Sequence, residues 1–177
     1  KVALISMNDR KKDAVDAELL ARLGRVDQAL LFPIQHRGEQ AQIDLQMIRT
    51  RDIVVQVRTK LIGHVRGAIK SFGERLPKCS TEAFVNTTRK LIPEQLRGAI
   101  DPIFDQIDQL TKTIDGYDRR IKQLVQERYP EAERVMQIKG VGALTALAYV
   151  LVLEDAGRFA SSRSVGAYLC LTSKTNQ

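Results

Sequence analysis

The stretch Val135–Leu171, VMQIKGVGALTALAYVLVLEDAGRFASSRSVGAYLCL, decides how the chain is organised. Its centre, IKGVG (138–142), separates two segments of helix-compatible sequence, 131–137 and 143–153. Two glycines around one apolar residue suit a tight turn, because glycine adopts positive φ and lets another backbone come close. The stretch therefore predicts two helices joined by a short hairpin. Inside it, Val141 is expected to point inward among four apolar neighbours: Val135, Ile138, Leu144 and Leu147.

The start of the second helix in this hairpin is a candidate nucleic-acid-binding site. The first amides of a helix have no partner within it, and they lie at the positive end of its dipole, which suits a phosphate. Lys139 adds a cation, while Gly140 and Gly142 would let a backbone approach. The pattern is typical of a helix-hairpin-helix, which binds a nucleic-acid backbone without reading bases. The alternative is an ordinary corner between two core helices, which Gly-x-Gly alone does not exclude.

The composition favours a folded protein with a polyanionic partner. The chain has 177 residues, of which 44% are hydrophobic and 28% charged, with a net charge of +7 and a pI near 9.6. No apolar run approaches the roughly 18 residues that a membrane-spanning helix needs, so no membrane partner is expected. The two cysteines and two histidines do not have the spacing of zinc ligands. Two cysteines far apart in the sequence are expected to be reduced, as in a cytoplasm. The basic charge points to nucleic acid.

Near the start of the chain, two carboxylates form a candidate metal site. Asp13 and Asp16 open a predicted helix that ends at Gly24. Three residues apart, they project from one face of the first turn and can share a Mg²⁺, which prefers carboxylate and water oxygens. The alternative is that both acids cap the helix and complement its dipole. The sequence pattern by itself leaves both open.

A long helix is predicted from Glu39 to Phe72, with a broad buried stripe and a basic remainder. Apolar residues recur at seven-residue spacing in two adjacent rows: Ile48, Val55, Ile62 and Ile69, flanked by Met47, Val54, Leu61 and Ala68. The other faces carry cations with Asp52 as the acid among them. Candidate phosphate contacts are Arg49, Arg51, Arg58, Lys60 and Arg66. A solvated surface without a ligand is the alternative.

A second long helix shows the most regular apolar periodicity in the chain. Its a and d positions are Ile100, Ile103, Ile107, Leu110, Ile114, Tyr117, Ile121 and Leu124. Asp101-Pro102 is expected to open this helix or to lie in its first turn, and Pro130 to end it. Such a seam predicts a coiled coil, whose partner is either the 39–72 helix of the same chain or another subunit.

Several spaced motifs resemble one protein family. Gly-Val-Gly-x-Leu-Thr-Ala, Leu-Glu-Asp-x-x-Arg-Phe and Arg-Ser-Val-Gly-Ala-Tyr-Leu-x-Leu follow in order within 140–171 and resemble the C-terminal domain of the IS110/IS1111 family of insertion-sequence transposases. At the other end, Lys11-x-Asp13-x-x-Asp16-Ala-Glu is similar to the end of the RuvC-like nuclease domain of that family. Cys170 and Ser173-Lys174 depart from the family pattern, where Gly and Pro-Arg are usual.

This resemblance implies a DNA transposase or site-specific recombinase. It implies that Asp13 and Asp16 are catalytic residues and Mg²⁺ ligands, the last two of an Asp-Glu-Asp-Asp set whose first two members lie upstream. It implies a nucleophilic serine just beyond the segment matched by 171–177; Ser173 is not at that position. It further implies guidance by a non-coding RNA, assembly as a homo-oligomer and a bacterial cytoplasmic location.

We therefore expect a mainly α-helical protein in three parts. Residues 1–36 are predicted to be the tail of a RuvC-like α/β domain, beginning with a strand at 2–5. Residues 37–129 are predicted to be a helical coiled-coil linker, and 130–177 an incomplete C-terminal transposase domain with a helix-hairpin-helix. The alternatives are a non-catalytic nucleic-acid-binding coiled-coil protein and a purely structural helical adaptor.

Overall fold

The computed structural model describes residues 13–27, 37–159, 161–169 and 171, and all regular structure within these ranges is helical. The mainly α-helical fold is thus confirmed. The chain divides into two compact units, Lys1–Arg37 and Gly38–Gln177. The predicted strand at 2–5 and the segment 172–177 lie outside the described residues. Of the helices that are described, none is long and apolar enough to cross a membrane.

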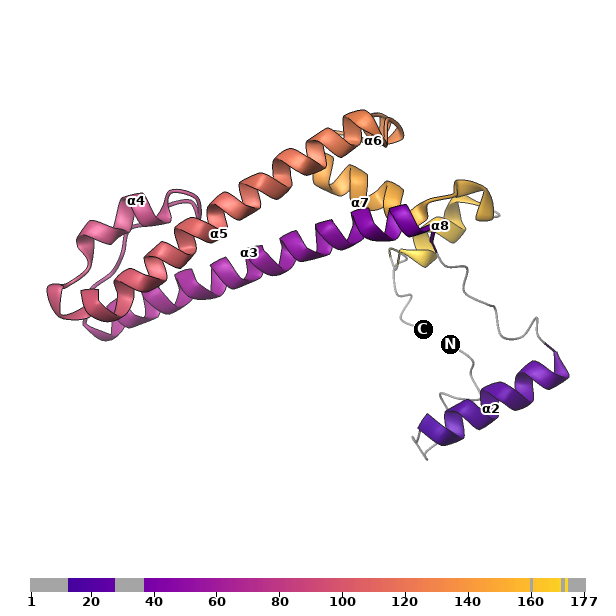
Figure 1. Cartoon of the computed structure of the whole chain (residues 1–177), viewed down its shortest axis with the longest axis horizontal. Coiled ribbons are helices and arrows are strands. Elements are labelled where there is room, and N and C mark those ends of the chain that lie inside the picture. Colours follow the sequence, from indigo (N-terminus) through magenta and orange to yellow (C-terminus); the bar gives the residue numbers. More distant parts are fainter. Residues whose placement is uncertain (1–12, 28–36, 160, 170, 172–177) are drawn as a thin grey trace, which may run out of the picture. The chain divides into compact units, whose positions relative to one another are not determined.

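The first unit contributes helix α2, Asp13–Val26 (Figure 1). Its amphipathic sequence places both candidate acids in the first turn and Arg25 in the last, as the helix dipole favours. The prediction that Gly24 ends this helix is wrong, because the helix continues through Gly24 to Val26.

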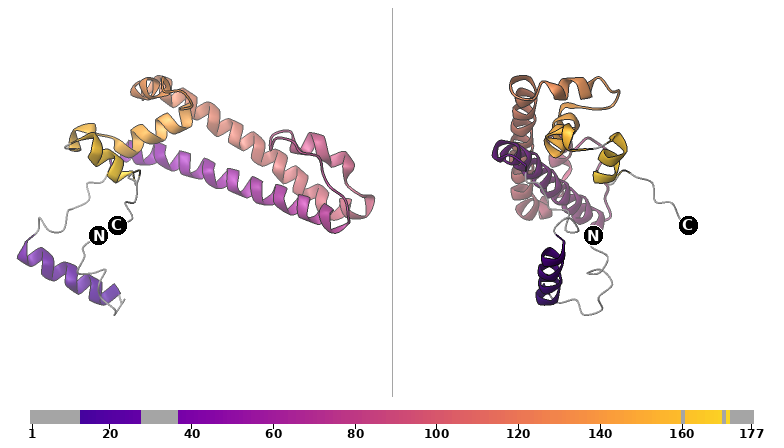
Figure 2. Two further views of the ribbon diagram at one scale, coloured as in Figure 1. Left: turned by 180° about the vertical axis from the view of Figure 1, so that it is seen from behind. Right: turned by 90° about the vertical axis from the view of Figure 1, so that its right-hand side faces the viewer.

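The second unit is built on a long helical hairpin (Figures 1 and 2). Helix α3, Glu39–Ser71, and helix α5, Glu94–Glu127, run side by side in opposite directions. The connection between them contains helix α4, Phe84–Thr88, and the 3-10 turn η2, Arg89–Leu91, both of which pack along the hairpin. The seam of α5 therefore has its partner in the same chain.

Helix α5 starts earlier than expected. It begins at Glu94, after Pro93, so Pro102 lies inside it rather than at its first turn. Proline removes an amide donor and its ring crowds the carbonyl four residues earlier. That residue is Gly98, whose position is exposed, so its freed carbonyl can bond to water. The helix accommodates Pro102 because of this exposed neighbour.

Two separate hydrophobic clusters hold the unit together. One joins the N-terminal half of α5 and the C-terminal half of α3 to α4, and consists of Ile62, Val65, Ile69, Phe84, Ile92, Ile100, Phe104 and Ile107. The other joins the N-terminal turns of α3 to the end of α5 and the two helices after it, and consists of Ala41, Leu45, Ile121, Leu124, Val125, Ala132, Ala146, Leu147 and Leu151. At both ends of the hairpin, apolar burial thus fixes the helices against one another.

Between the clusters, α3 meets α5 through a row of polar residues at seven-residue spacing. Arg51 Nε lies 2.6 Å from Asp118 Oδ1 and Arg51 Nη2 lies 3.1 Å from Oδ2, a two-pronged ion pair. Arg58 is 5% exposed and donates to Thr111 of α5. Asp44, at the start of the row, is 4% exposed and faces the end of α5. Because each of these side chains has a definite partner, the row fixes the register of the hairpin.

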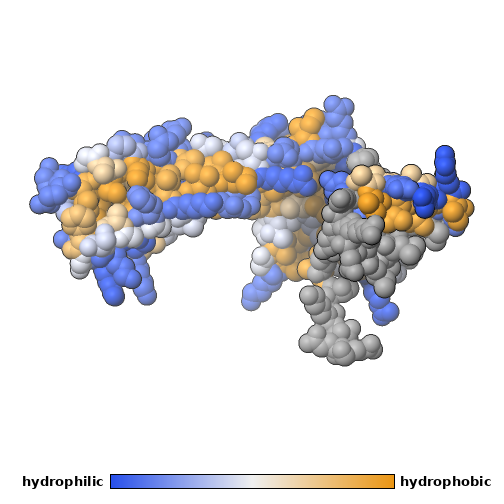
Figure 3. Space-filling view, turned by 90° about the horizontal axis from the view of Figure 1, so that it is seen from below, coloured by the Kyte–Doolittle hydropathy of each residue, from blue (hydrophilic) through white to orange (hydrophobic). Residues whose placement is uncertain are grey.

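The predicted buried stripe of α3 is found only in part: Ile62 and Ile69 are buried, whereas Ile48 and Val55 are half-buried. The row Asp44, Arg51, Arg58 and Val65 faces α5, whereas the expected flanking row of Met47, Val54, Leu61 and Ala68 is only half-buried. Apolar residues outside the seam are exposed: Ile43 is 55% exposed, Ile53 57% and Val57 41%. Figure 3 shows a hydrophobic band between rows of hydrophilic side chains along the hairpin.

Asp44 links the start of α3 to the end of α5 through hydrogen bonds. Its Oδ2 accepts hydrogen bonds from Arg128 (2.9 Å), the Tyr129 hydroxyl (2.7 Å) and Gln40 (3.3 Å). Burial alone would raise the pKa of Asp44, but these hydrogen bonds outweigh it and hold that pKa below its ordinary value of 3.8. Burial, together with the bond to Asp44, raises the pKa of Tyr129 to about 12.

This carboxylate predicts a specific dependence of stability on pH. A lowered pKa in the folded state contributes stability above the unfolded value of 3.8, which is lost as the pH falls through the folded value. The free energy of unfolding of the wild-type chain, measured in urea, should therefore fall more steeply below about pH 4 than that of Asp44→Asn. Asp52→Asn, an exposed change on the same helix, is the control. Parallel curves for Asp44→Asn and wild type would contradict the prediction.

Candidate nucleic-acid interface

The central stretch of the sequence forms two helices joined by a tight turn. Helix α6 spans Glu131–Met136 and helix α7 spans Ala143–Leu153. Between them, Gly140 has φ 91°, a conformation that other residues rarely adopt. The amide of Val141 donates to the carbonyl of Ile138 (3.0 Å), which closes the turn. The predicted helical hairpin is therefore present, and position 140 is the one in the turn whose positive φ requires glycine.

The turn leaves the start of α7 open. Gly142 precedes the helix in an extended conformation (φ −91°, ψ 173°) and supplies no side-chain cap. The amides of Ala143, Leu144 and Thr145 come before the first α-helical bond, from Ala146 N to Gly142 O (2.9 Å). A Cβ at Gly142 would meet no described atom within 4 Å, so the residue that precedes α7 borders open space.

Lys139 extends from this turn into solvent. Among the described residues it has no hydrogen-bond or ion-pair partner, so its charge is available to a ligand. Of the expected inward residues, Leu147 is fully buried and Val135, Val141 and Leu144 are partly buried against the same cluster. Ile138 is 61% exposed, so its predicted inward position is wrong. Ile138 contributes its carbonyl to the turn, where it accepts from Val141 N, while its side chain faces solvent.

The cations predicted along α3 fall into two groups. Arg51 and Arg58 lie in the seam with α5, and Arg58 also donates to Thr81 (3.2 Å) and Glu82 (3.1 Å). Arg66 donates to the backbone carbonyls of Leu76 and Pro77 and lies over the Phe84 ring, 5.1 Å from its centroid. Phosphate binding by these three stays a prediction: acids pair with Arg51 and Arg58, whereas the partners of Arg66 are uncharged.

The second group consists of Arg49 and Lys60. Both side chains are exposed on α3, and neither has a partner in the part of the chain that the structure describes. They are eleven residues apart, close to three turns of an α-helix, so they share one face. These two cations remain available for a phosphate, whereas Asp118 and Glu82 neutralise Arg51 and Arg58.

The two candidate metal ligands lie in the other unit, at the first turn of α2. Asp13 is exposed and Asp16 is half-buried. Within residues 13–27 and 37–171, apart from the undescribed positions, no three potential ligands gather closely enough to hold a metal ion. Two carboxylates on one turn fit part of the oxygen shell of Mg²⁺ but do not complete it.

The motif Leu-Glu-Asp-x-x-Arg-Phe at the end of α7 contains structural residues whose roles the sequence did not predict. Glu154 has φ 56° and its Oε1 accepts a hydrogen bond from Gly38 N (2.7 Å), which fastens the start of α3 to the end of α7. Asp155 accepts from Gly157 N (2.7 Å) and caps the 3-10 turn η3, Ala156–Arg158. The two-residue spacing of Asp155 and Gly157 could have indicated such a cap. Nothing in the sequence indicated that Glu154 contacts Gly38, 116 positions earlier.

Arg158 organises the final described segment, which ends in helix α8, Ser162–Tyr168. Its guanidinium lies 4.8 Å from the ring centroids of both Phe159 and Tyr168, and these two rings meet edge to face at 5.3 Å. Ser161 caps α8 by accepting from Ser164 N. The charge of Arg158 therefore serves the packing of this segment.

The chain's similarities point to one family. Residues 132–177, which contain the α6–α7 turn, α7 and α8, match the family model described as the transposase IS116/IS110/IS902 family. The predicted resemblance to IS110-family transposases is confirmed. No solved structure matches the chain.

Curated relatives extend this similarity over nearly the whole chain. A probable family 20 transposase of Pseudomonas aeruginosa is 25% identical over 91% of the chain and 49% of its own length. The transposase for insertion sequence element IS1111A of Coxiella burnetii is 23% identical over 93% of the chain and 46% of its own length. The transposase for insertion sequence element IS1328 of Yersinia enterocolitica is 25% identical over 91% of the chain and 48% of its own length. The chain thus spans about half the length of the curated relatives it matches.

Proposed function

We propose that this chain is part of a DNA transposase, a site-specific recombinase of an insertion sequence. The observation that carries the proposal is the family match over 132–177, the segment that holds the open start of α7 and Lys139. In this role the α6–α7 hairpin acts as a helix-hairpin-helix: the free amides of α7 and the Lys139 ammonium bind one phosphate of a nucleic-acid backbone. Such contacts position the protein and are independent of base sequence.

The catalytic chemistry is proposed to involve both ends of the chain. Asp13 and Asp16 would hold Mg²⁺ together with ligands outside the described residues, and a serine outside them would be the nucleophile on the phosphodiester. When bound, Mg²⁺ stabilises negative charge on the transferring phosphoryl group. The first turn of α2 supports this role, because it presents both carboxylates from one rigid helix.

The partners proposed for the intact protein are DNA, a non-coding guide RNA and further copies of the same chain. Arg49 and Lys60, exposed and unpaired among the described residues, are additional candidates for phosphate contacts. Ile43, Ile53 and Val57 share one exposed face of α3, which is a candidate surface for the proposed assembly.

The hairpin contact can be tested with three single variants of the chain. Lys139→Ala should weaken binding to a short DNA duplex and lower the slope of log K against log salt by about one. Gly142→Ala should weaken binding with little loss of stability, since its φ suits alanine and the added methyl meets no described atom but adjoins the proposed phosphate contact. Gly140→Ala should lower the free energy of unfolding by about 1 kcal/mol or more, because its φ does not suit alanine.

Fluorescence anisotropy gives the affinities, and urea unfolding gives the stabilities. The two glycine variants are matched, since each adds one methyl group to the same turn. Equal effects of both on stability, with unchanged affinity for Lys139→Ala and Gly142→Ala, would show that the turn is only a corner of the core and reject it as a nucleic-acid contact.

A further inference from the structure

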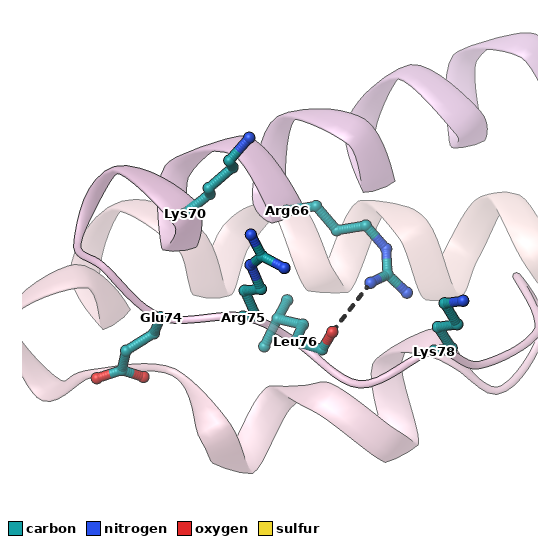
Figure 4. A pocket seen from close by; sticks show the side chains of 6 residues that line it. All are labelled: Arg66, Lys70, Glu74, Arg75, Leu76 and Lys78. Carbon is teal, nitrogen blue, oxygen red and sulfur yellow. Dashed lines mark hydrogen bonds between the residues drawn. The ribbon is translucent and has the colours of Figure 1, made fainter.

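The far end of the α3–α5 hairpin carries a cationic hollow that is separate from the α6–α7 turn. It has a volume of about 400 Å³ and is lined by Arg66, Lys70, Glu74, Arg75, Leu76 and Lys78 (Figure 4). Over the 31 residue steps from Glu39 to Lys70, α3 rises by roughly 45 Å. The hollow therefore lies far along the helix from the end that packs on α7.

The hollow exists because of how α3 ends. Gly73 has φ 83°, and its amide donates to Lys70 O (3.0 Å) while the amide of Glu74 donates to Ile69 O (3.3 Å). These two bonds form a Schellman motif, which stops the helix and reverses the chain. The following segment then returns along α3, with Leu76 packed on the hydrophobic cluster beneath it. As a result Arg75 and Lys78 join Arg66 and Lys70 around one space.

The charge in this hollow is not balanced from within the chain. Lys70, Arg75 and Lys78 are exposed and form no ion pair with any described residue. Arg66 is held in place by uncharged partners: the carbonyls of Leu76 and Pro77, Cys79 Sγ at 3.5 Å and the Phe84 ring. Glu74 is the one acid in the lining, and Figure 4 shows its carboxylate pointing away from Arg66.

Four cations around one space repel one another, so a bound anion relieves an existing cost. The lining contains a single apolar side chain, Leu76, and so lacks the apolar walls with which proteins hold small organic ligands. Arginine forks suit phosphate oxygens and lysines act as point charges beside them. The lining therefore fits the phosphates of an extended polyanion.

We propose that this hollow binds phosphate groups of a nucleic-acid backbone, as a second contact site at the opposite end of the hairpin from the α6–α7 turn. Arg66 provides a fixed charge at the side of the hollow, and Lys70, Arg75 and Lys78 close around the phosphates. The proposal rests on the proposed function, which supplies a nucleic-acid partner. The backbone chemistry is common to DNA and RNA, and the experiment separates these two sources.

The test compares two triple variants of the chain that remove equal charge. Lys70→Ala/Arg75→Ala/Lys78→Ala empties the hollow of its exposed cations, while Lys90→Ala/Lys112→Ala/Lys122→Ala removes three exposed lysines elsewhere in the same unit. Fluorescence anisotropy with a labelled DNA duplex and an RNA duplex of the same sequence, between about 50 and 200 mM salt, gives affinities and salt slopes. Circular dichroism checks that both variants stay folded.

For the hollow variant we expect the slope of log K against log salt to fall by about two to three, with a smaller change in the control. Loss with the DNA probe assigns the hollow to DNA, and loss with the RNA probe alone assigns it to RNA. Equal slopes for the two triple variants, or no binding of either probe by the wild-type chain, would overturn the inference. If Lys139→Ala weakens binding and the hollow variant does not, the inference fails while the proposed function stands.

Discussion

Phe104→Ala is expected to lower the free energy of unfolding by about 3 to 5 kcal/mol, enough to remove most of the stability of a domain of this size. Phe104 is 0% exposed, and its ring stacks on Phe84 with centroids 5.8 Å apart. It also lies beneath the guanidinium of Arg89, which is 5.8 Å from its centroid. Truncation leaves a cavity where α5, α4 and η2 meet.

Phe72→Ala is the matched control, because Phe72 follows α3 and is 57% exposed. Its cost should stay within about 0.5 kcal/mol. Urea unfolding followed by circular dichroism measures both variants, and light scattering reports any change of assembly. Similar losses for the two phenylalanines would mean that the cluster around α4 does not hold the hairpin together.

The sequence pattern predicted the helices well where local periodicity and packing agree. The a positions of α5, Ile100, Ile107, Ile114 and Ile121, are all buried, as their seven-residue spacing requires. The turn at 138–142 was predictable because a glycine between two helical segments signals positive φ. In each case the structural preference lies within a few residues of the chain.

The orientation of α3 could not be predicted in this way. Apolar periodicity favoured the row Ile48, Val55, Ile62 and Ile69, of which Ile62 and Ile69 are buried. The row that faces α5 instead contains Asp44, Arg51 and Arg58. Charged residues score as solvent-facing unless their partners are known, and here the partners on α5 and beyond it follow 53 to 85 positions later. The same long-range pairing is what removed Arg51 and Arg58 from the set of available cations.

The candidate site was predicted in part for a related reason. Lys139 was found because it adjoins the glycine turn, and Arg49 and Lys60 because they lie on a helix face. Arg75 and Lys78 were not found, because they follow α3 in an irregular segment. Only the reversal at Gly73 brings them beside Arg66 and Lys70. Residues that converge through a loop leave no periodic signal in the sequence.

The largest expected effect on activity belongs to the two acids of α2. In the intact protein, Asp13→Asn and Asp16→Asn should each lower recombination by at least about 100-fold, since a metal ion contributes several kcal/mol to phosphoryl transfer. Asparagine caps a helix about as well as aspartate, so these changes separate metal binding from capping. Glu18→Gln, an exposed acid on the same helix that pairs with Arg22, is the control and should keep full activity.

Mg²⁺ binding provides a second readout that does not depend on turnover. The 177-residue chain should bind Mg²⁺ weakly, because Asp13 and Asp16 supply too few oxygens and the described residues offer no third ligand beside them. The intact protein should bind it measurably in calorimetry and lose that binding in either Asn variant, with an unchanged circular dichroism spectrum. Full recombination by the double Asn variant would show that the two acids only cap α2, because a Mg²⁺ site without their charge would no longer retain the ion.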